Sequence, residues 1–141
     1  MKTRIIAFAA FIVICFASQP AFSQVQYHPL DTIEDVLIEY RWQKASFFGK
    51  DPDAILNLKI TNISDDFLEL VFTAGFYRDG QLFFESPEQD LCLAPGETRR
   101  GGRADLRFSA EGIRMSTIEE EWFSWDLPFL NVNIVADCPD D

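Results

Sequence analysis

The sequence predicts an all-β protein, an antiparallel immunoglobulin-like β-sandwich of about seven strands. Three observations lead to that prediction. Apolar and polar residues alternate with a period of two over several stretches, turn-forming residues separate these stretches roughly every 8 to 15 residues, and no stretch has a convincing long helical period.

Residues 54–85 are the centre of this pattern, and we expect them to form three consecutive strands. Residues 62–66 form the first turn, because they are rich in side chains that hydrogen-bond their own backbone. Asp79-Gly80, between two alternating runs, is a strong hairpin signal. One alternating set faces a buried layer; its apolar members are Leu56, Leu58, Ile60, Leu68, Leu70, Phe72, Ala74 and Phe76.

The residues before this centre carry weaker signals. Residues 24–30 are a polar lead-in, and residues 33–42 favour a strand over a helix because they are rich in β-branched and aromatic residues. Residues 46–53 form a turn-rich connection. We expect Phe47 and Phe48, within it, to fold over an edge of the sheet.

The residues after the centre predict a short apolar strand at 91–93 and a Pro-Gly turn at 94–97. Alternation predicts a further strand over residues 98–109. Residues 110–121 fit either a loop or a short helix capped by Ser109.

The last part of the chain is expected to complete the sandwich. Residues 122–127 are aromatic and strand-like, and Pro128 indicates a bend or an edge position. Residues 130–136 alternate again and predict the final strand.

Residues 1–23 have the order of a secretory signal peptide. Basic Lys2 and Arg4 precede an apolar run and a small-x-small site, which predicts cleavage after Ser23. A membrane anchor is the alternative, but the apolar run is shorter than the roughly 18 residues that a bilayer requires. We therefore expect residues 24–141 to form a single domain in the periplasm or the extracellular space, without a membrane span.

Two cysteines, Cys92 and Cys138, remain after removal of the leader, which contains Cys15. Two thiols in an exported chain are expected to form a disulfide. A redox or metal pair is the alternative, but these cysteines lack CxxC spacing and a neighbouring histidine.

The chain is strongly acidic. Its net charge is −11, and loss of the two basic leader residues takes it to −13. This charge argues against binding to nucleic acid or anionic lipid surfaces. Acidic residues in the expected loops could hold calcium, but none has the spacing of an EF-hand; they are Asp51, Asp53, Asp65, Asp66, Asp137, Asp140 and Asp141. We therefore predict no metal site.

The sequence predicts no enzyme and no cofactor. The one histidine, His28, lies in the polar lead-in, and no nucleophile, base and orienting group can be assembled around it. Paired carboxylates could act without histidine, but neighbouring residues among Glu119, Glu120 and Glu121 would point to opposite faces of a strand.

Three segments resemble the small immunoglobulin-like domains of exported bacterial proteins, the group that includes FxLyD-type domains. They are residues 58–64, which end in an Asn-x-Ser turn, residues 76–80, which carry Phe-Tyr before a Gly turn, and residues 93–98, which carry Pro-Gly-Glu. The resemblance covers roughly residues 54–108. It implies a non-catalytic module of adhesion, assembly or unknown role.

Two clusters are candidate interaction surfaces, and both have structural alternatives. A basic stretch could bind an anionic ligand or an acidic segment, or could protect a strand edge. An aromatic stretch could anchor a partner or belong to the core. The residues concerned are Arg99, Arg100, Arg103 and Arg107, and Trp122, Phe123 and Trp125.

Together these patterns predict an exported, non-enzymatic module that binds another envelope or extracellular protein. Binding would occur through a strand edge or the aromatic C-terminal region. A module that binds carbohydrate or another small ligand is the alternative.

Overall fold

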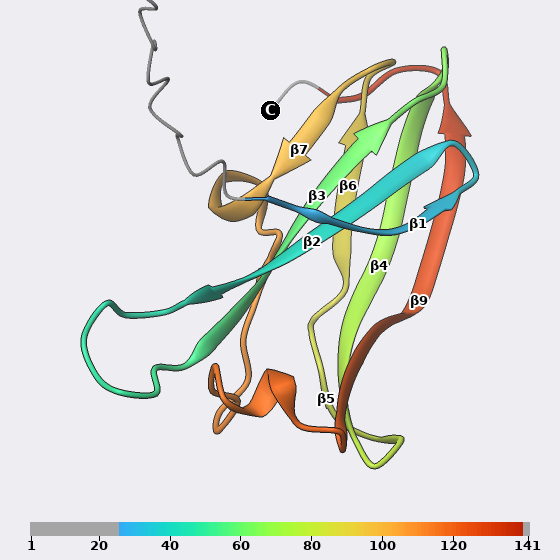
Figure 1. The fold of residues 1–141 in the computed structure, drawn as a ribbon. Coiled ribbons are helices and arrows are strands. Elements are labelled where there is room, and N and C mark those ends of the chain that lie inside the picture. The colour runs from blue at the N-terminus through green and yellow to red at the C-terminus, as the bar shows by residue number, and fades with distance from the viewer. Residues whose placement is uncertain (1–25, 140–141) are drawn as a thin grey trace, which may run out of the picture.

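The computed structural model describes residues 26–139, and in this part of the chain nine strands form two antiparallel sheets that pack face to face (Figure 1). This confirms the predicted β-sandwich, while the leader predicted in residues 1–23 lies outside the described residues. The strands are β1 (His28–Ile33), β2 (Val36–Lys44), β3 (Ala54–Asn62), β4 (Phe67–Arg78), β5 (Gln81–Glu85), β6 (Gln89–Leu93), β7 (Thr98–Arg100), β8 (Arg107–Phe108) and β9 (Phe123–Val135).

The first sheet contains β1, β2 and β3 in that order, and β7 and β8 pair one after the other with the far edge of β3. A two-residue turn at Glu34 and Asp35, with φ of 46° and 62°, joins β1 to β2. The strand predicted in residues 33–42 is confirmed by β2. The loose lead-in predicted for residues 24–30 is wrong, because His28, Pro29 and Leu30 belong to β1 and the hairpin between β1 and β2 was not predicted. Glu-Asp lacks the Asn and Gly that usually mark such a turn.

The second sheet is built around β4. β9 pairs along one edge of β4, while β5 and β6 share the other edge. The predicted Asp79-Gly80 turn is present, with φ of 49° and 77°. β9 is continuous where the sequence predicted two strands. Residues 127–128 oppose Ala74 alone, so Pro128 lies in a bulge. Because β9 is an edge strand, it tolerates this proline and continues past it.

Residues 98–109 form two short strands and not the single predicted one. Between β7 and β8 the chain leaves the sheet in a short 3-10 helix, η1 (Gly101–Ala104), which begins with Gly101 at a φ of 61°. The helix considered after Ser109 is also absent. Residues 110–121 contain turns and a single 3-10 turn, η2 (Thr117–Glu119).

Phe47 and Phe48 do not fold over the sheet, contrary to the prediction. Their side chains are 96% and 87% exposed. Residues 46–53 extend past the ends of β2 and β3, away from the body of the sandwich (Figure 1), so no strand lies beneath the two rings.

The core lies between the sheets and contains the alternating residues that face inward. All eight apolar residues predicted for the central strands are buried, each at most 3% exposed. The core also contains Val36, Ile38, Ala54, Leu91, Leu93, Leu106, Phe108, Ile113 and Phe123.

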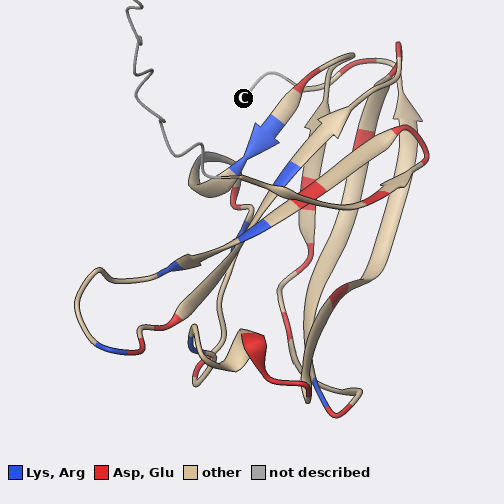
Figure 2. Cartoon of the chain, in the orientation of Figure 1, with Lys and Arg blue, Asp and Glu red and all other residues tan. Residues whose placement is uncertain are grey.

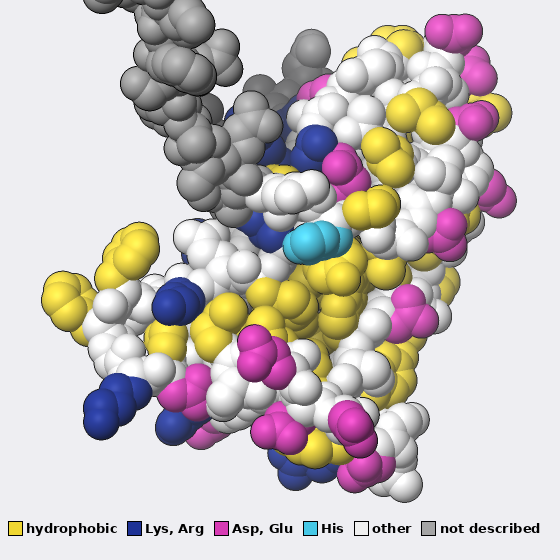
Figure 3. Space-filling model, in the orientation of Figure 1, with side chains coloured by type: hydrophobic (Ala, Val, Ile, Leu, Met, Phe, Trp, Pro, Cys, Tyr) yellow, Lys and Arg dark blue, Asp and Glu magenta, His cyan; other side chains and the backbone are white. Residues whose placement is uncertain are grey.

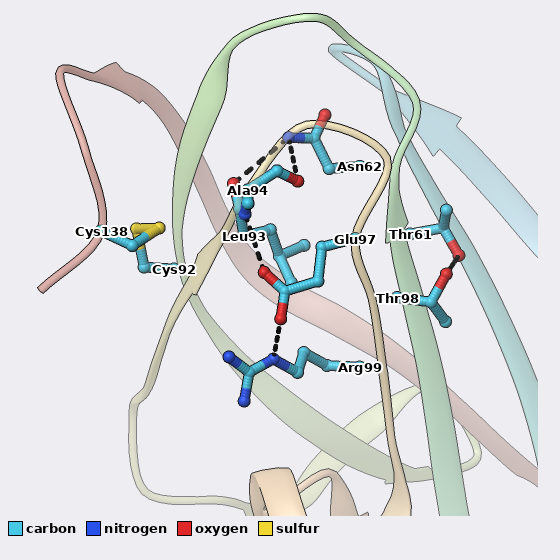
Figure 4. Close-up of polar contacts among 9 residues, drawn as sticks. All are labelled: Thr61, Asn62, Cys92, Leu93, Ala94, Glu97, Thr98, Arg99 and Cys138. Carbon is cyan, nitrogen blue, oxygen red and sulfur yellow. Dashed lines mark hydrogen bonds and ion pairs between the residues drawn. A yellow bond between two sulfur atoms is a disulfide. The ribbon is translucent and has the colours of Figure 1, made fainter. Parts of the chain in front are cut away.

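Asn62, at the end of β3, is a buried polar connection between the sheets (Figure 4). Its side-chain amide donates to the carbonyl oxygens of Leu93 (3.2 Å) and Ala94 (3.1 Å), at the end of β6, and of Asp66 (2.7 Å). The backbone N–H of Asn62 donates to the carbonyl oxygen of Glu97 in the Pro-Gly turn. These bonds join the end of β3 to the end of β6 and to the Pro-Gly turn, and we call this place the inter-sheet corner. It fixes the position of β7 against β3.

The predicted disulfide between Cys92 and Cys138 is present, with the Cα atoms 5.6 Å apart. Cys92 lies on β6, and Cys138 follows β9, on the other side of β4. The bridge therefore connects the two strands that flank β4 and fixes the end of the described chain (Figure 4).

Candidate functional site

The two sheets differ in width. The first has four strand positions, β1, β2, β3 and the edge shared by β7 and β8; the second has three, β9, β4 and the edge shared by β5 and β6. β2 stacks on β9 through Tyr40 and Trp125, whose ring centroids lie 4.9 Å apart. β1 therefore extends beyond β9, and each of its residues is exposed.

Apolar side chains line the space beneath β1 and beside β9. The register with β4 places Leu130, Val132 and Ile134 on the inward side of β9, yet Ile134 is 71% exposed. Ile33 of β1, which also faces inward, is 37% exposed. A cavity of about 530 Å³ lies between the β1–β2 turn, the β3–β4 turn and β9. We call residues 129–135 of β9, together with the inward side of β1, the edge slot.

The backbone of β9 is regular within the edge slot. Residues 129–135 pair continuously with β4 from Thr73 to Phe67, whereas the bulge and Pro128, which has no N–H, interrupt the ladder just before them. Among the described strands β9 pairs with β4 alone. Its other edge therefore presents free backbone donors and acceptors.

Acidic side chains surround the edge slot. Glu34 and Asp35 of the β1–β2 turn line its cavity together with Asp66, and Asp31 lies on β1. Neither β1 nor β9 contains Lys or Arg. The slot consequently has a negative potential.

The aromatic residues predicted as an interaction surface belong largely to the packing. Phe123 is only 8% exposed and lies in the core, which corrects its assignment to a surface. Trp125 is half-buried and stacks edge-on against Tyr40. Trp122, also half-buried, lies under the guanidinium of Arg78, 4.8 Å from its ring centre.

The predicted basic stretch is divided between two sides of the first sheet. Arg99 donates to the carboxylate of Glu97 at the inter-sheet corner (Figure 4). Arg103 lies in η1. Arg100 and Arg107 pair with outward-facing residues of β3 and therefore share the outer face.

His28 lies on β1 and not in a loose lead-in, with its ring 5.7 Å from that of Tyr40. Figure 3 shows apolar surface directly beside this histidine. Within residues 26–139, no group of three or more His, Cys, Asp and Glu side chains could hold a metal ion.

Asp51, considered as a calcium ligand, has a structural role. Its carboxylate accepts hydrogen bonds from the hydroxyl (2.6 Å) and the backbone N–H (3.0 Å) of Ser116. These bonds, the side-chain bond most strongly, lower the pKa of Asp51, and nearby Arg114 acts in the same direction. The contact holds residues 46–53 against the segment that contains η2.

The sequence patterns indicated neither the edge slot nor the outer-face residues Arg41 and Lys59. Their polar positions in alternating strands were visible, but the register between strands decides which side chains become neighbours. Ile134 likewise belonged to the predicted last strand, and only the missing fourth strand position leaves it exposed.

Comparison with protein-family models, curated proteins and solved structures gives no match for this chain. The resemblance to FxLyD-type domains therefore stays a prediction. In the part of the chain that the structure describes, no helix is long and apolar enough to cross a membrane.

Proposed function

We propose that this protein is an exported, non-enzymatic module that binds an extended segment of another protein by strand addition at the edge slot. The difference in width between the sheets is the observation that carries this proposal. A strand added to the free edge of β9 would gain backbone hydrogen bonds from β9 and would also cover the exposed inward side of β1.

The chemistry of the edge slot indicates the partner. An added strand would bury every second side chain against Leu130, Val132 and Ile134, so those side chains would be apolar. The acidic rim favours Lys or Arg at the ends of the segment. A second copy of this chain fits less well, because Glu34, Asp35 and Asp66 beside its own β9 would bring like charges together.

The test uses a synthetic peptide of about seven alternating Val and Thr residues, the length of residues 129–135, with Lys at both ends. Binding to the mature protein is measured by fluorescence anisotropy of a dye on the peptide. We expect saturable binding that weakens at least about tenfold when alternate peptide nitrogens are methylated, because methylation removes the donors of strand pairing. A peptide with Glu at both ends should bind more weakly than the Lys peptide.

Two variants of β9 locate the site. Ile134→Lys places a charge on the inward side of the edge slot, and Phe129→Lys places the same charge on the outward side of the same strand. Both parent side chains are already exposed (71% and 45%), so both variants should fold. We expect only Ile134→Lys to lose binding; equal loss in both variants, or full binding of the methylated peptide, would contradict strand addition.

A further inference from the structure

The outer face of the first sheet gathers cations from three strands. The register places Lys59 of β3 between Glu39 of β2 and Arg100 of β7, and the next outward row holds Arg41 of β2 beside Asn57. Figure 2 shows the corresponding blue segments of β2, β3 and β7 close together. This concentration of positive charge is unusual in a chain whose net charge is −11.

These cations line a groove of about 1010 Å³ together with Tyr27, Gln26 and Gly101. The ring of Tyr27 lies over the sheet, with its centre 4.7 Å from the guanidinium carbon of Arg41 and 5.7 Å from Nζ of Lys59. These contacts fix one wall of the groove and hold Arg41 in place. A groove of this size accommodates a small molecule.

Among the described residues, the charges that line the groove do not balance. Glu39, the one carboxylate among the described lining residues, forms an ion pair with Lys59, in which Oε2 and Nζ lie 2.6 Å apart. Arg41 and Arg100 remain as two further cations in that lining. The Nε of Arg41 is buried and has no hydrogen-bond acceptor among the described residues. An unmatched buried guanidinium donor is unfavourable, and an oxyanion is the acceptor that best complements it.

We propose that this groove binds the oxyanion group of a small molecule, a carboxylate, phosphate or sulfate, through Arg41 and Arg100, beside the ring of Tyr27. A small ligand fits better than a large polyanion. The cations are confined to one groove, and the acidic remainder of the chain would repel an extended negative polymer.

The test titrates the mature, uniformly ¹⁵N-labelled protein separately with inorganic phosphate, sulfate and citrate at constant ionic strength. The Nε–H signal of Arg41 is followed by NMR, because this group should donate directly to the oxyanion. Arg100→Ala removes one cation of the groove. Lys50→Ala removes the same charge from an exposed residue of the loop over residues 46–53 and is the matched control.

We expect a saturable shift of the Arg41 signal with at least one anion. Arg100→Ala should raise the dissociation constant of that anion about tenfold or more, and Lys50→Ala should raise it less than about twofold. A preference for phosphate and sulfate over citrate would identify a tetrahedral group, and the reverse preference a carboxylate. No saturable shift with any of the three anions, or equal weakening in both variants, would overturn the proposal. Binding of heparin without binding of any small anion would overturn it as well.

Discussion

Asn62 is the residue at which one small substitution should most weaken the polar connection between the two sheets. Its side chain is fully buried and donates to three carbonyl oxygens, while its Oδ1 accepts from the backbone N–H (2.9 Å) and the hydroxyl (2.7 Å) of Ser64. Asn62→Ala removes all of these bonds and leaves buried carbonyl groups without a donor. At about 1 kcal/mol for each of two donated and two accepted bonds, partly offset by relaxation, we expect a loss of about 3 kcal/mol in the free energy of unfolding.

Asn62→Asp tests the same site with a matched shape. The carboxylate would face three carbonyl oxygens in a buried site, so at pH 7 this variant should be less stable than Asn62→Ala. Burial raises the pKa of such an aspartate in the folded state above its unfolded value of about 3.9. The penalty is therefore fully present above the folded pKa and disappears as the pH falls through the folded and then the unfolded value.

The assay is urea unfolding followed by tryptophan fluorescence, at pH 7 and at pH 4, for the parent and both variants. Asn133→Asp is the control, because Asn133 is exposed on the outward side of β9. A loss below about 1 kcal/mol for Asn62→Ala would refute the role of the buried amide. The reasoning would also be refuted if the difference in free energy of unfolding between Asn62→Asp and Asn133→Asp were as large at pH 4 as at pH 7.

Three further predictions concern other connections in the fold. The double variant Cys92→Ala, Cys138→Ala should lose about 4 kcal/mol in urea unfolding, from the entropy of a loop with a sequence separation of 46; a loss under about 1 kcal/mol would contradict this. Glu34→Asn with Asp35→Gly should stabilise the protein by about 1 kcal/mol, because both positions have positive φ, and a lowered melting temperature would be the contrary result. The hydrogen bonds to Asp51 stabilise the fold at neutral pH, and that contribution should disappear only as the pH falls through its lowered pKa. An NMR titration in which the Asp51 carboxyl protonates with the exposed aspartates would contradict it.

The central strands could be predicted because their signals are local. Alternation identified the buried set from Leu56 to Phe76, and Asp79-Gly80 supplied the positive φ values that its turn requires. The disulfide followed from the presence of only two cysteines after the predicted leader. In each case neighbouring residues, or a simple count, were sufficient.

The remaining features depend on interactions between residues distant in sequence. Glu34 and Asp35 adopt positive φ without Asn or Gly, because pairing between β1 and β2 compensates for an unfavourable turn. Pro128 suggested a break in β9, yet a bulge opposite Ala74 lets the strand continue. Alternation alone could not reveal that the outer face brings Arg100 beside Lys59, because that depends on the register between β3 and β7.

β1 connects both proposed surfaces, and core packing does not account for it. All of its residues are exposed, so it contributes little apolar burial and is held chiefly by its pairing with β2. Tyr27, just before β1, covers the basic groove, while Ile33, at its other end, faces the edge slot. A strand added beside β9 would give β1 the second layer that it lacks, and an oxyanion bound beside Tyr27 would hold the residues that precede β1. The least buried of the described strands is therefore the one whose position both proposed binding events would stabilise.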